Sequence, residues 1–483
     1  MLSRFTQLIS KTPMAVVIAP FVMGIFFAEK ILLPVWVLLL VCTVSLVGVI
    51  SLTKWWQNLA LVAMIFSVGA LLHTLSYRDT TAYNTPVEML LAVEKSSVKR
   101  KGYTSAEARV EASGDNSLSG RKIVLWGDSL TSFNAGDKLY LTTTIKPFRA
   151  EHEQYARLMH HRGFVGSVAI NSNSIYEYFP AEHRTLHDRA VSRLQRAMAK
   201  SDARAVVLAM TTGERSEISS ELRQRYSASG ASHLLAVSGL HIGIAFMLIN
   251  ILLLPMVLLR YGNITRSLLA IVMIWLYVWL CGMSPSAVRA AIMFSLLQFS
   301  LSSLREYTSV NILAGTAFVM LAFNSHLLFD ISFQLSFIAV AGIILWAVPL
   351  YRRCVTRFRS LNSIIGVMLV GIASTLATMP LVADIFSMVS FVGILINPAV
   401  ILLANIVVLT GIVAIALPFT AVIAEYAAEL QNKIVEWAAS LPYGHFEIAI
   451  PEWAMWTIYG VFLIATILLW LIPKREKKPI IEG

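Results

Sequence analysis

Residues 233–243 read His233-Leu-Leu-Ala-Val-Ser238-Gly239-Leu-His241-Ile-Gly243, and the apolar run that they open continues to Leu259. Two histidines, a serine and two glycines thus lie in a segment that otherwise has the composition of a membrane span. Lipid offers no hydrogen-bond partner, so polar residues at membrane depth are costly and usually functional. Span formation alone does not explain this stretch, and we ask what the rest of the chain says about it.

The composition of the whole chain is that of a membrane protein. Of its 483 residues, 57% are hydrophobic and 14% are charged, whereas a soluble domain carries about 25% charged residues. The mean hydropathy is +0.69. Apolar stretches of roughly 20 residues, the length that spans a bilayer, recur from end to end. Because backbone in lipid must bond within its own segment, we predict a polytopic α-helical membrane protein.

Three apolar stretches at 13–28, 31–53 and 58–76 predict transmembrane helices within residues 1–76. Basic residues favour the cytoplasmic side, so Arg4, Lys11 and Lys54 are expected inside, which places the chain after residue 77 outside. Later apolar segments are expected at about 231–259, 265–282, 286–303, 308–324, 330–351, 362–381, 388–416 and 452–472. The 388–416 run fits one long span, a re-entrant piece plus a span, or two short spans. Residues 422–441 are amphipathic and are expected at the membrane interface.

Residues 77–180 have the pattern of a small extracytoplasmic β domain inserted between spans. Turn residues separate short alternating runs, as expected for strands, at Glu107–Ala112, Arg121–Trp126, Asp137–Ile145, Phe164–Ile170 and Ile175–Phe179. About five short strands in a domain of this size favour a β-barrel of the OB type.

Basic and aromatic residues on this β domain predict a weak DNA-binding face. Lys122 and Trp126 share one strand face, and Tyr140 is expected on a nearby strand. Aromatic platforms beside basic groups are how OB-type barrels hold single-stranded nucleic acid. The alternative is that the aromatic rings fill the barrel core.

Residues 181–230 predict amphipathic or interfacial helices. Leu186, Ala190 and Leu194 form an apolar stripe that is flanked by arginines. A basic amphipathic helix of this kind can lie on a membrane surface. Packing on the barrel is the alternative, and the sequence does not separate the two.

The polar residues of the opening stretch admit several kinds of site. His233 and His241 are eight residues apart, about 12 Å along a helix, so a metal ion held by both is not expected. Ser238 and His241 are helical neighbours that suit a nucleophile and its base, but no acid lies close in sequence to orient the histidine. Gly239 tolerates broken backbone, which occurs at membrane depth where it faces a cavity. We therefore predict that His233, Ser238, Gly239 and His241 line a transport path, with helix–helix contact through small residues as the alternative.

Three further motifs are candidates for the same path. In Ser284-Pro-Ser-Ala-Val-Arg289, the serine can cap a helix that begins at Pro285, and Arg289 follows one turn later. A capped helix start beside an arginine is suited to an anion, although an arginine reaching a headgroup is the simpler alternative. Asp330 and Gln334 lie one helical turn apart, where Asp330 can also act as a cap. Asn397-Pro398 predicts a discontinuous helix.

No cofactor or metal site is expected from the remaining residues. Cys42, Cys281 and Cys354 are far apart in sequence, lie in or beside apolar segments, and form no Cys-x-x-Cys pair. We interpret them as core thiols.

The motifs His233–His241, Ser284–Ala290 and Asp330–Ser336, in this order, resemble the competence domain of the ComEC family. The early spans, the extracytoplasmic β domain and the segment 151–163 are similar to that family in order. The resemblance implies a competence-type channel domain over 231–473, a basic cytoplasmic tail at 474–483 and location in the bacterial inner membrane. At 213–215 this chain has Gly213-Glu214-Arg215 where the family pattern has Gly-Asp-Arg, which leaves the role of Glu214 open.

The resemblance also implies a function. ComEC proteins are expected to carry single-stranded DNA into the cytoplasm during natural transformation, beside a DNA receptor, a separate nuclease and a cytoplasmic translocase. Many carry a C-terminal β-lactamase-like metal domain, but no His-x-His-x-Asp-His run occurs in this sequence, so a nuclease role is not carried over. No Walker-type motif is present to drive movement. The net charge of +11 suits an anionic partner, either DNA or lipid.

We therefore expect a channel rather than an enzyme. Two alternatives stay open: a transporter for another anionic or amphipathic substrate, such as a lipid or glycan precursor, and an intramembrane hydrolase that uses Ser238 and His241.

Overall fold

The computed structural model describes residues 12–31, 33–76, 83–100, 103–115, 118–128, 133, 135–148, 153–170, 175–180, 185–302, 308–386, 388–390, 392–441, 445–448 and 450–471. The predicted tail at 474–483 lies outside these residues. The chain divides into two compact units. The first comprises Met1–Gln224, Ser232–Gln334 and Leu402–Lys433, and the second Arg225–Ala231, Leu335–Ile401 and Ile434–Gly483.

In the described part of the chain, six helices are long and apolar enough to cross a membrane: Pro13–Lys30, Trp55–Ser76, Gly262–Leu280, Ile331–Cys354, Leu361–Ile385 and Val392–Ala416. Shorter apolar helices cover Val35–Ser51, Gly239–Leu252, Pro285–Phe299, Ser309–Phe323 and Trp453–Leu468. Large apolar side chains such as Trp36, Ile50 and Trp279 are exposed on these helices, as suits a lipid-facing surface. The prediction of a polytopic helical membrane protein with an inserted small β domain is confirmed.

The first unit begins with helices α2 (Pro13–Lys30), α3 (Val35–Ser51) and α4 (Lys54–Ser76). Pro13 begins α2, where its missing N–H costs no hydrogen bond. Helices α2 and α4 cross closely because glycine lies at both contact points. A Cβ on Gly24 would meet the carbonyl oxygen of Phe66, and a Cβ on Gly69 would meet that of Phe21. These small residues let the two backbones touch, as in many membrane helix pairs.

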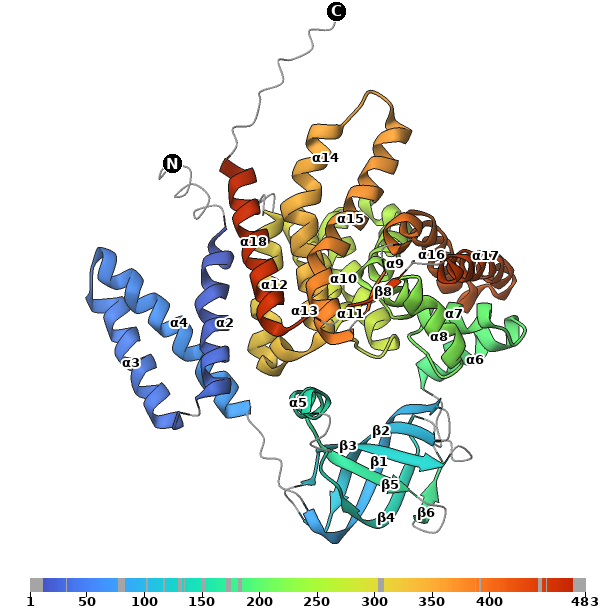
Figure 1. Cartoon of the computed structure of the whole chain (residues 1–483), viewed down its shortest axis with the longest axis horizontal. Helices are drawn as coiled ribbons and strands as arrows, with labels where there is room; N and C mark the ends of the chain where they lie inside the picture. Colours follow the sequence, from blue (N-terminus) through green and yellow to red (C-terminus); the bar gives the residue numbers. More distant parts are fainter. Residues whose placement is uncertain are drawn as a thin grey trace, which may run out of the picture. The chain divides into compact units, whose positions relative to one another are not determined.

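The inserted β domain contains β1 (Tyr83–Arg100), β2 (Tyr103–Ser113), β3 (Lys122–Asp128), β4 (Lys138–Ile145), β5 (Phe164–Ile170) and β6 (Ile175–Phe179). They form one curved sheet in the order β5-β3-β2-β1-β4-β6, with β3 and β5 parallel (Figure 1). An antiparallel bridge between Lys146 and Ser167 links the end of β4 to β5. The inward side chains are mainly aliphatic, with Leu91, Leu125 and Leu139 almost fully buried.

Strand β1 was not predicted from the sequence, although it pairs with both β2 and β4. Its register against β2 shifts at three places, between Leu90 and Leu91, between Val93 and Lys95, and between Lys95 and Val98. Each irregularity disturbs the alternation of inward and outward side chains that identifies a strand in sequence. Helix α5 (Glu153–His161), between β4 and β5, packs on the sheet through the cluster of Val124, Met159 and Phe164.

Helices α6 (Leu186–Ala197), α7 (Asp202–Thr211) and α8 (Ser220–Ala228) follow the β domain. The apolar face of α6 packs against α7 and against the turn Pro418–Thr420, and Arg193 donates a hydrogen bond to the carbonyl of Ile415 at 3.0 Å. The sequence had suggested either the membrane surface or the β-barrel as the packing partner of this helix, and neither α7 nor the Pro418–Thr420 turn. Helix α7 is buried rather than interfacial, since its side chains from Ala205 to Thr211 are all buried.

The remaining helices of the first unit are α9 (Gly239–Leu252), α10 (Gly262–Leu280), α11 (Pro285–Ser302) and α12 (Ser309–Phe323), followed by the 3-10 turn η5 (Ser325–Phe329) and the start of α13 (Ile331–Gly342). Helices α9, α10 and α11 share one apolar core that includes Ile242, Ile274 and Ala291. This core fixes the start of α9 beside the first turns of α11.

The second unit contains α14 (Val348–Cys354), α15 (Arg359–Phe386), the strands β7 (Met388–Ser390) and β8 (His445–Glu447), and α18 (Glu452–Leu471). Helices α16 (Val392–Ala416) and α17 (Ala421–Ser440) each have residues in both units. Of the alternatives for 388–416, the structure has one long helix preceded by a short strand. The predicted discontinuity at Asn397-Pro398 is wrong, because Pro398 lies inside the continuous helix α16. Membrane helices tolerate such prolines where neighbouring groups satisfy the freed carbonyl.

Candidate functional site

The opening stretch passes through a 3-10 turn and an extended segment before it enters α9. Ser232–Leu235 forms a 3-10 turn, and Ser238 is extended with φ −106° and ψ 168° immediately before the helix. The backbone N–H of Ser238 donates to Nδ1 of His241 at 3.3 Å. This side chain therefore caps its own helix. The prediction of a broken segment is confirmed, and the break ends at the first turn of α9.

A tight turn positions α11 beside the start of α9. Gly282 and Met283 have positive φ values of 76° and 52°, a left-handed conformation that is unfavourable for a side chain such as methionine. The hydroxyl of Ser286 then donates to the carbonyl of Val237 at 2.7 Å. This bond ties the first turn of α11 to the residue just before Ser238. Ser284 accepts from the backbone N–H of Ala287 at 3.4 Å, as the predicted cap.

Arg289 lies against the N-terminal turn of α9. Its Nη2 is 2.9 Å from the position that a Cβ would occupy on Gly239, so only glycine leaves room for the guanidinium here. Arg289 is 6% exposed, and its Nη1 contacts Sδ of Met293 at 3.6 Å. The guanidinium thus places hydrogen-bond donors beside the positive end of the α9 helix dipole. The arrangement is chemically suited to an anionic group.

His241 adds a second polar group to this region. The ring is fully buried, and its Nδ1 accepts from Ser238, so a neutral ring carries its hydrogen on Nε2. Nε2 has no hydrogen-bond partner among the described residues. Within those residues no cluster of histidine, cysteine and carboxylate side chains has metal-site geometry.

Asp330 and Gln334 form hydrogen bonds at the beginning of α13. Oδ1 of Asp330 accepts from the backbone N–H groups of Ser332 and Phe333, at 2.8 and 3.2 Å. Its Oδ2 lies 3.7 Å from Nε of Arg162, which follows α5 of the β domain. Gln334 donates to the carbonyl of Leu328 at 2.8 Å. The capping alternative therefore describes Asp330 well, and the ion pair gives it a second role.

Two other predicted path residues, His233 and Asn397, make no contact with the Arg289 side chain that the structure establishes. His233 is exposed in the 3-10 turn before α9. Asn397 is buried in the part of α16 that belongs to the second unit.

In the β domain, Lys122 and Trp126 lie on the outer face of β3, as the strand alternation predicted. Nζ of Lys122 pairs with Glu94 at 2.9 Å. The Trp126 ring is 5.1 Å from that of Tyr103 and also packs beside Met159 of α5. Tyr140 is on β4, which is not adjacent to β3 in the sheet. Lys122 and Trp126 therefore form one face with Tyr103, without Tyr140.

Sequence reasoning left open the role of Glu214, which the structure pairs with His187 of α6. Nε2 of His187 is 3.5 Å from Oε2 of Glu214, and its Nδ1 donates to the carbonyl of Leu280 at 2.7 Å. Burial would raise the pKa of Glu214, but hydrogen bonds from His187 and Ser216 outweigh it and lower the pKa to about 2. The hydrogen bond to Glu214 raises the pKa of His187. This pair fixes α6 next to the α10–α11 turn.

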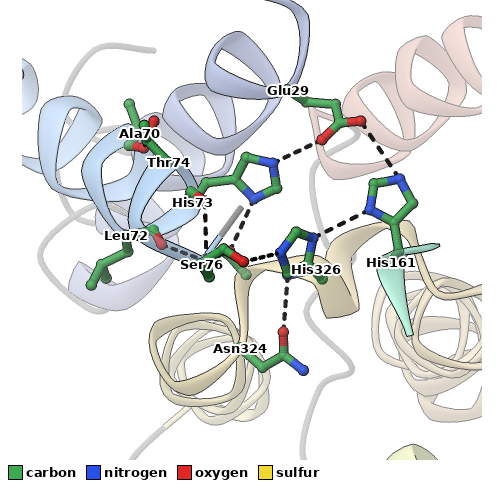
Figure 2. Close-up of polar contacts among 10 residues, drawn as sticks. Glu29, Ala70, Leu72, His73, Thr74, Ser76, His161, Asn324 and His326 are labelled. Carbon is green, nitrogen blue, oxygen red and sulfur yellow. Dashed lines mark hydrogen bonds and ion pairs between the residues drawn. The ribbon is translucent and has the colours of Figure 1, made fainter. Parts of the chain in front are cut away.

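A second group that the sequence did not reveal joins four elements. Glu29 of α2, His73 of α4, His161 of α5 and His326 of η5 lie side by side (Figure 2). An ionisable residue within a span, as His73 is, was the available signal. The partners come from segments up to 297 residues apart (326 − 29), which no local pattern connects.

Comparison with known proteins places this geometry in context. A family model described as "Competence protein" matches residues 210–473, more than half of the chain. The ComE operon protein 3 of Bacillus subtilis (strain 168) is 28% identical over 270 residues, covering 56% of this chain and 33% of that protein. An uncharacterized protein of Aquifex aeolicus (strain VF5) is 27% identical over 285 residues, covering 56% of this chain and 64% of its own length. The uncharacterized protein YcaI of Escherichia coli (strain K12) is 26% identical over 172 residues, covering 34% of this chain and 22% of that protein.

The matched region thus spans about one third of the Bacillus relative and less than two thirds of the Aquifex relative. No solved structure matches this chain. The matched region of the family model contains α9, α11, Arg289 and the Gly213-Glu214-Arg215 turn.

Proposed function

Because this chain belongs to the Competence protein family of ComEC-like proteins, we propose that it takes part in DNA uptake and passes single-stranded DNA through the bacterial inner membrane. The observation that carries the proposal is the buried guanidinium of Arg289 against the N-terminal turn of α9. A cation at membrane depth costs about 2.5–3.5 kcal/mol on insertion scales. A guanidinium in this position can contact a passing anion, and the DNA backbone presents one phosphate per nucleotide.

The local geometry favours weak contacts that a moving strand can leave. One arginine, the N-terminal turn of α9 and the buried His241 provide a few donors rather than a cage of cations. Conduction requires sites that are attractive enough to enter and weak enough to leave. We assign Arg289, Gly239, Ser238 and His241 to this site, with Ser284 and Ser286 holding α11 in place.

We further propose that the β domain lies on the extracytoplasmic side and receives the strand. The strand order β3-β2-β1-β4, the parallel β3–β5 pair and the Lys146–Ser167 bridge support a barrel of the OB type. Tyr103, Lys122 and Trp126 on its outer face offer the aromatic and basic groups that single strands stack and pair with. A DNA receptor, a separate nuclease and a cytoplasmic translocase are the expected partners.

The test follows labelled DNA in a transformable host that lacks its own copy of this gene. The host is complemented with the wild type, with Arg289→Gln and with Arg266→Gln. Arg266 is the matched control, because this arginine of α10 bonds the side chain of Asn250 at 3.1 Å, near the other end of α9. We expect Arg289→Gln to abolish delivery of labelled single strands to the cytoplasm, with equal membrane levels of all three proteins. Normal delivery in the uncomplemented host would contradict the proposal.

These strains, together with an added strain that carries Ser238→Ala, separate the alternatives. A transporter of lipid or glycan precursors predicts normal DNA delivery together with an altered envelope composition. An intramembrane hydrolase predicts that Ser238→Ala alone abolishes function. For that mechanism the structure offers no support, since Nδ1 of His241 accepts from the backbone N–H of Ser238.

A further inference from the structure

Three histidines and one glutamate meet where α5 of the β domain lies against the ends of α2 and α4 (Figure 2). His73 and His326 are 1% and 9% exposed, and the side chain of His161 is 9% exposed. The His161 ring also stacks on Phe329, with centroids 4.5 Å apart and planes at 20°. The contacts that hold α5 here therefore depend on imidazole rings in a largely dry position.

The hydrogen positions in this cluster follow from its partners. Nε2 of His326 is 3.0 Å from the carbonyl oxygen of Ser76, and a carbonyl can only accept, so this Nε2 carries a hydrogen. Nδ1 of a neutral His326 is then an acceptor. It lies 3.3 Å from Nδ1 of His161, which must donate. One hydrogen therefore bridges the His161 ring of α5 and the His326 ring of η5.

A third contact limits how many protons the pair can hold. Nε2 of His161 is 3.6 Å from Oε1 of Glu29, too long for a hydrogen bond. Oε2 of Glu29 already accepts from Nε2 of His73 at 2.8 Å. One added proton can be accommodated, because it gives the His161–Glu29 contact its missing hydrogen. A second added proton leaves both Nδ1 atoms protonated, with two N–H groups and two positive charges facing each other.

We propose that His161 and His326 form a proton-binding site that holds α5 of the β domain on the membrane-spanning helices at neutral pH and releases it when both rings are protonated. The site uses chemistry separate from the Arg289 region and does not depend on what crosses the membrane.

The surrounding charges favour the neutral, docked form at neutral pH. Burial, opposed by the attraction of Glu29, lowers the pKa of His161 to about 4, and burial also lowers the pKa of His326. Besides Glu29, the ionisable groups that act on the pair are His73 on α4 and His160 beside it on α5. The next residue in the chain, Arg162, lies 3.7 Å from Asp330 in an ion pair. A histidine whose pKa is lowered on docking stabilises the docked state above its ordinary pKa of about 6.5, and this contribution is lost as the pH falls.

The experiment measures the separation of α5 from α4 in the purified full chain. Spin labels are attached at Ala156→Cys on α5 and Leu75→Cys on α4, with Cys42 and Cys354 replaced by serine and buried Cys281 left in place. Pulsed electron paramagnetic resonance then gives the distance distribution at neutral and acid pH. We expect one narrow distribution at neutral pH, and loss of that distribution in acid.

Variants assign the response to the pair. His161→Gln retains a donor toward His326 but cannot be protonated, so we expect the narrow distribution at both pH values. His326→Gln gives the same expectation from the other ring, and covers the case in which one variant does not fold. His160→Gln is the matched control and should respond as the wild type does. An unchanged wild-type distribution in acid, or an acid response that survives in both glutamine variants, overturns the proposal.

Discussion

Nη2 of Arg289 lies 2.9 Å from the point where a Cβ on Gly239 would stand. The glycine therefore sets how closely the only arginine in α11 approaches the first turn of α9. Glycine matters here because its missing side chain leaves room for the guanidinium. Its backbone conformation does not require glycine, since its φ is not among the positive values. A substitution at Gly239 therefore tests the position of Arg289 directly.

Gly239→Ala is expected to displace the guanidinium while leaving the fold intact, because the atom in the way is the far end of a flexible side chain. DNA delivery should fall on the order of tenfold, which corresponds to about 1.4 kcal/mol. Uptake of labelled DNA per amount of membrane protein measures it. Gly371→Ala is the control, since a Cβ on that helical glycine meets nothing within 4 Å; an equal loss in both variants would contradict the assignment.

The His187–Glu214 pair predicts a pH dependence of stability. The contribution of Glu214 to the free energy of unfolding is complete above its ordinary pKa of 4.5. It is lost as the pH falls toward about 2. The contribution of His187 is complete below its ordinary pKa of 6.5. It is lost as the pH rises through the raised pKa that His187 has in the folded protein. The pair should contribute on the order of 1–3 kcal/mol between these limits.

Thermal unfolding of the purified chain against pH measures this contribution. Glu214→Gln should remove the loss of stability on the alkaline side. Glu217→Gln is the matched control, because Glu217 pairs with Arg204 at 2.9 Å and arginine stays charged throughout. If the two variants have the same alkaline profile, His187 does not titrate as proposed.

Gly166→Ala is expected to destabilise the β domain at the point where β4 meets β5. A Cβ there would stand 2.6 Å from the carbonyl oxygen of Lys146 and 2.7 Å from Cγ2 of Ile145. Backbone must move to relieve this, at a cost of roughly 1–3 kcal/mol. Limited proteolysis of the full chain at rising temperature should cleave the β domain earlier than in the wild type, while Gly114→Ala, which meets nothing within 4 Å, should not differ.

Gly69→Ala should separate α2 from α4 and so loosen the Glu29–His73 contact. Its Cβ would collide with the carbonyl oxygen of Phe21, so the helices must shift, again at roughly 1–3 kcal/mol. In the spin-labelled chain we expect a broadened α4–α5 distribution already at neutral pH. Gly460→Ala, whose Cβ meets nothing within 4 Å, provides the comparison, and a narrow distribution in Gly69→Ala would show that this crossing does not position the cluster.

Local sequence patterns were enough to predict the class of protein, a small β domain inserted between membrane-spanning helices, and the helix start at Pro285. Apolar length fixes a membrane span because the bilayer has one thickness, and Ser284-Pro285 marks a helix start because capping is a local bond. These predictions used only residues that are close together in the sequence. The Asn397-Pro398 motif did not predict the outcome, because Pro398 lies inside the continuous helix α16.

Which polar residues contact one another became evident only in the folded protein. Arg289 contacts the Gly239 turn and Asp330 pairs with Arg162, although both motifs looked alike as candidates for one path. Glu29, His73, His161 and His326 come together from four elements, and strand β1 took its place through pairing with β2 and β4 despite its irregular alternation. Helical period and hydropathy are properties of neighbours in sequence, whereas a buried hydrogen bond depends on how whole elements pack, and that packing is settled by the entire core at once.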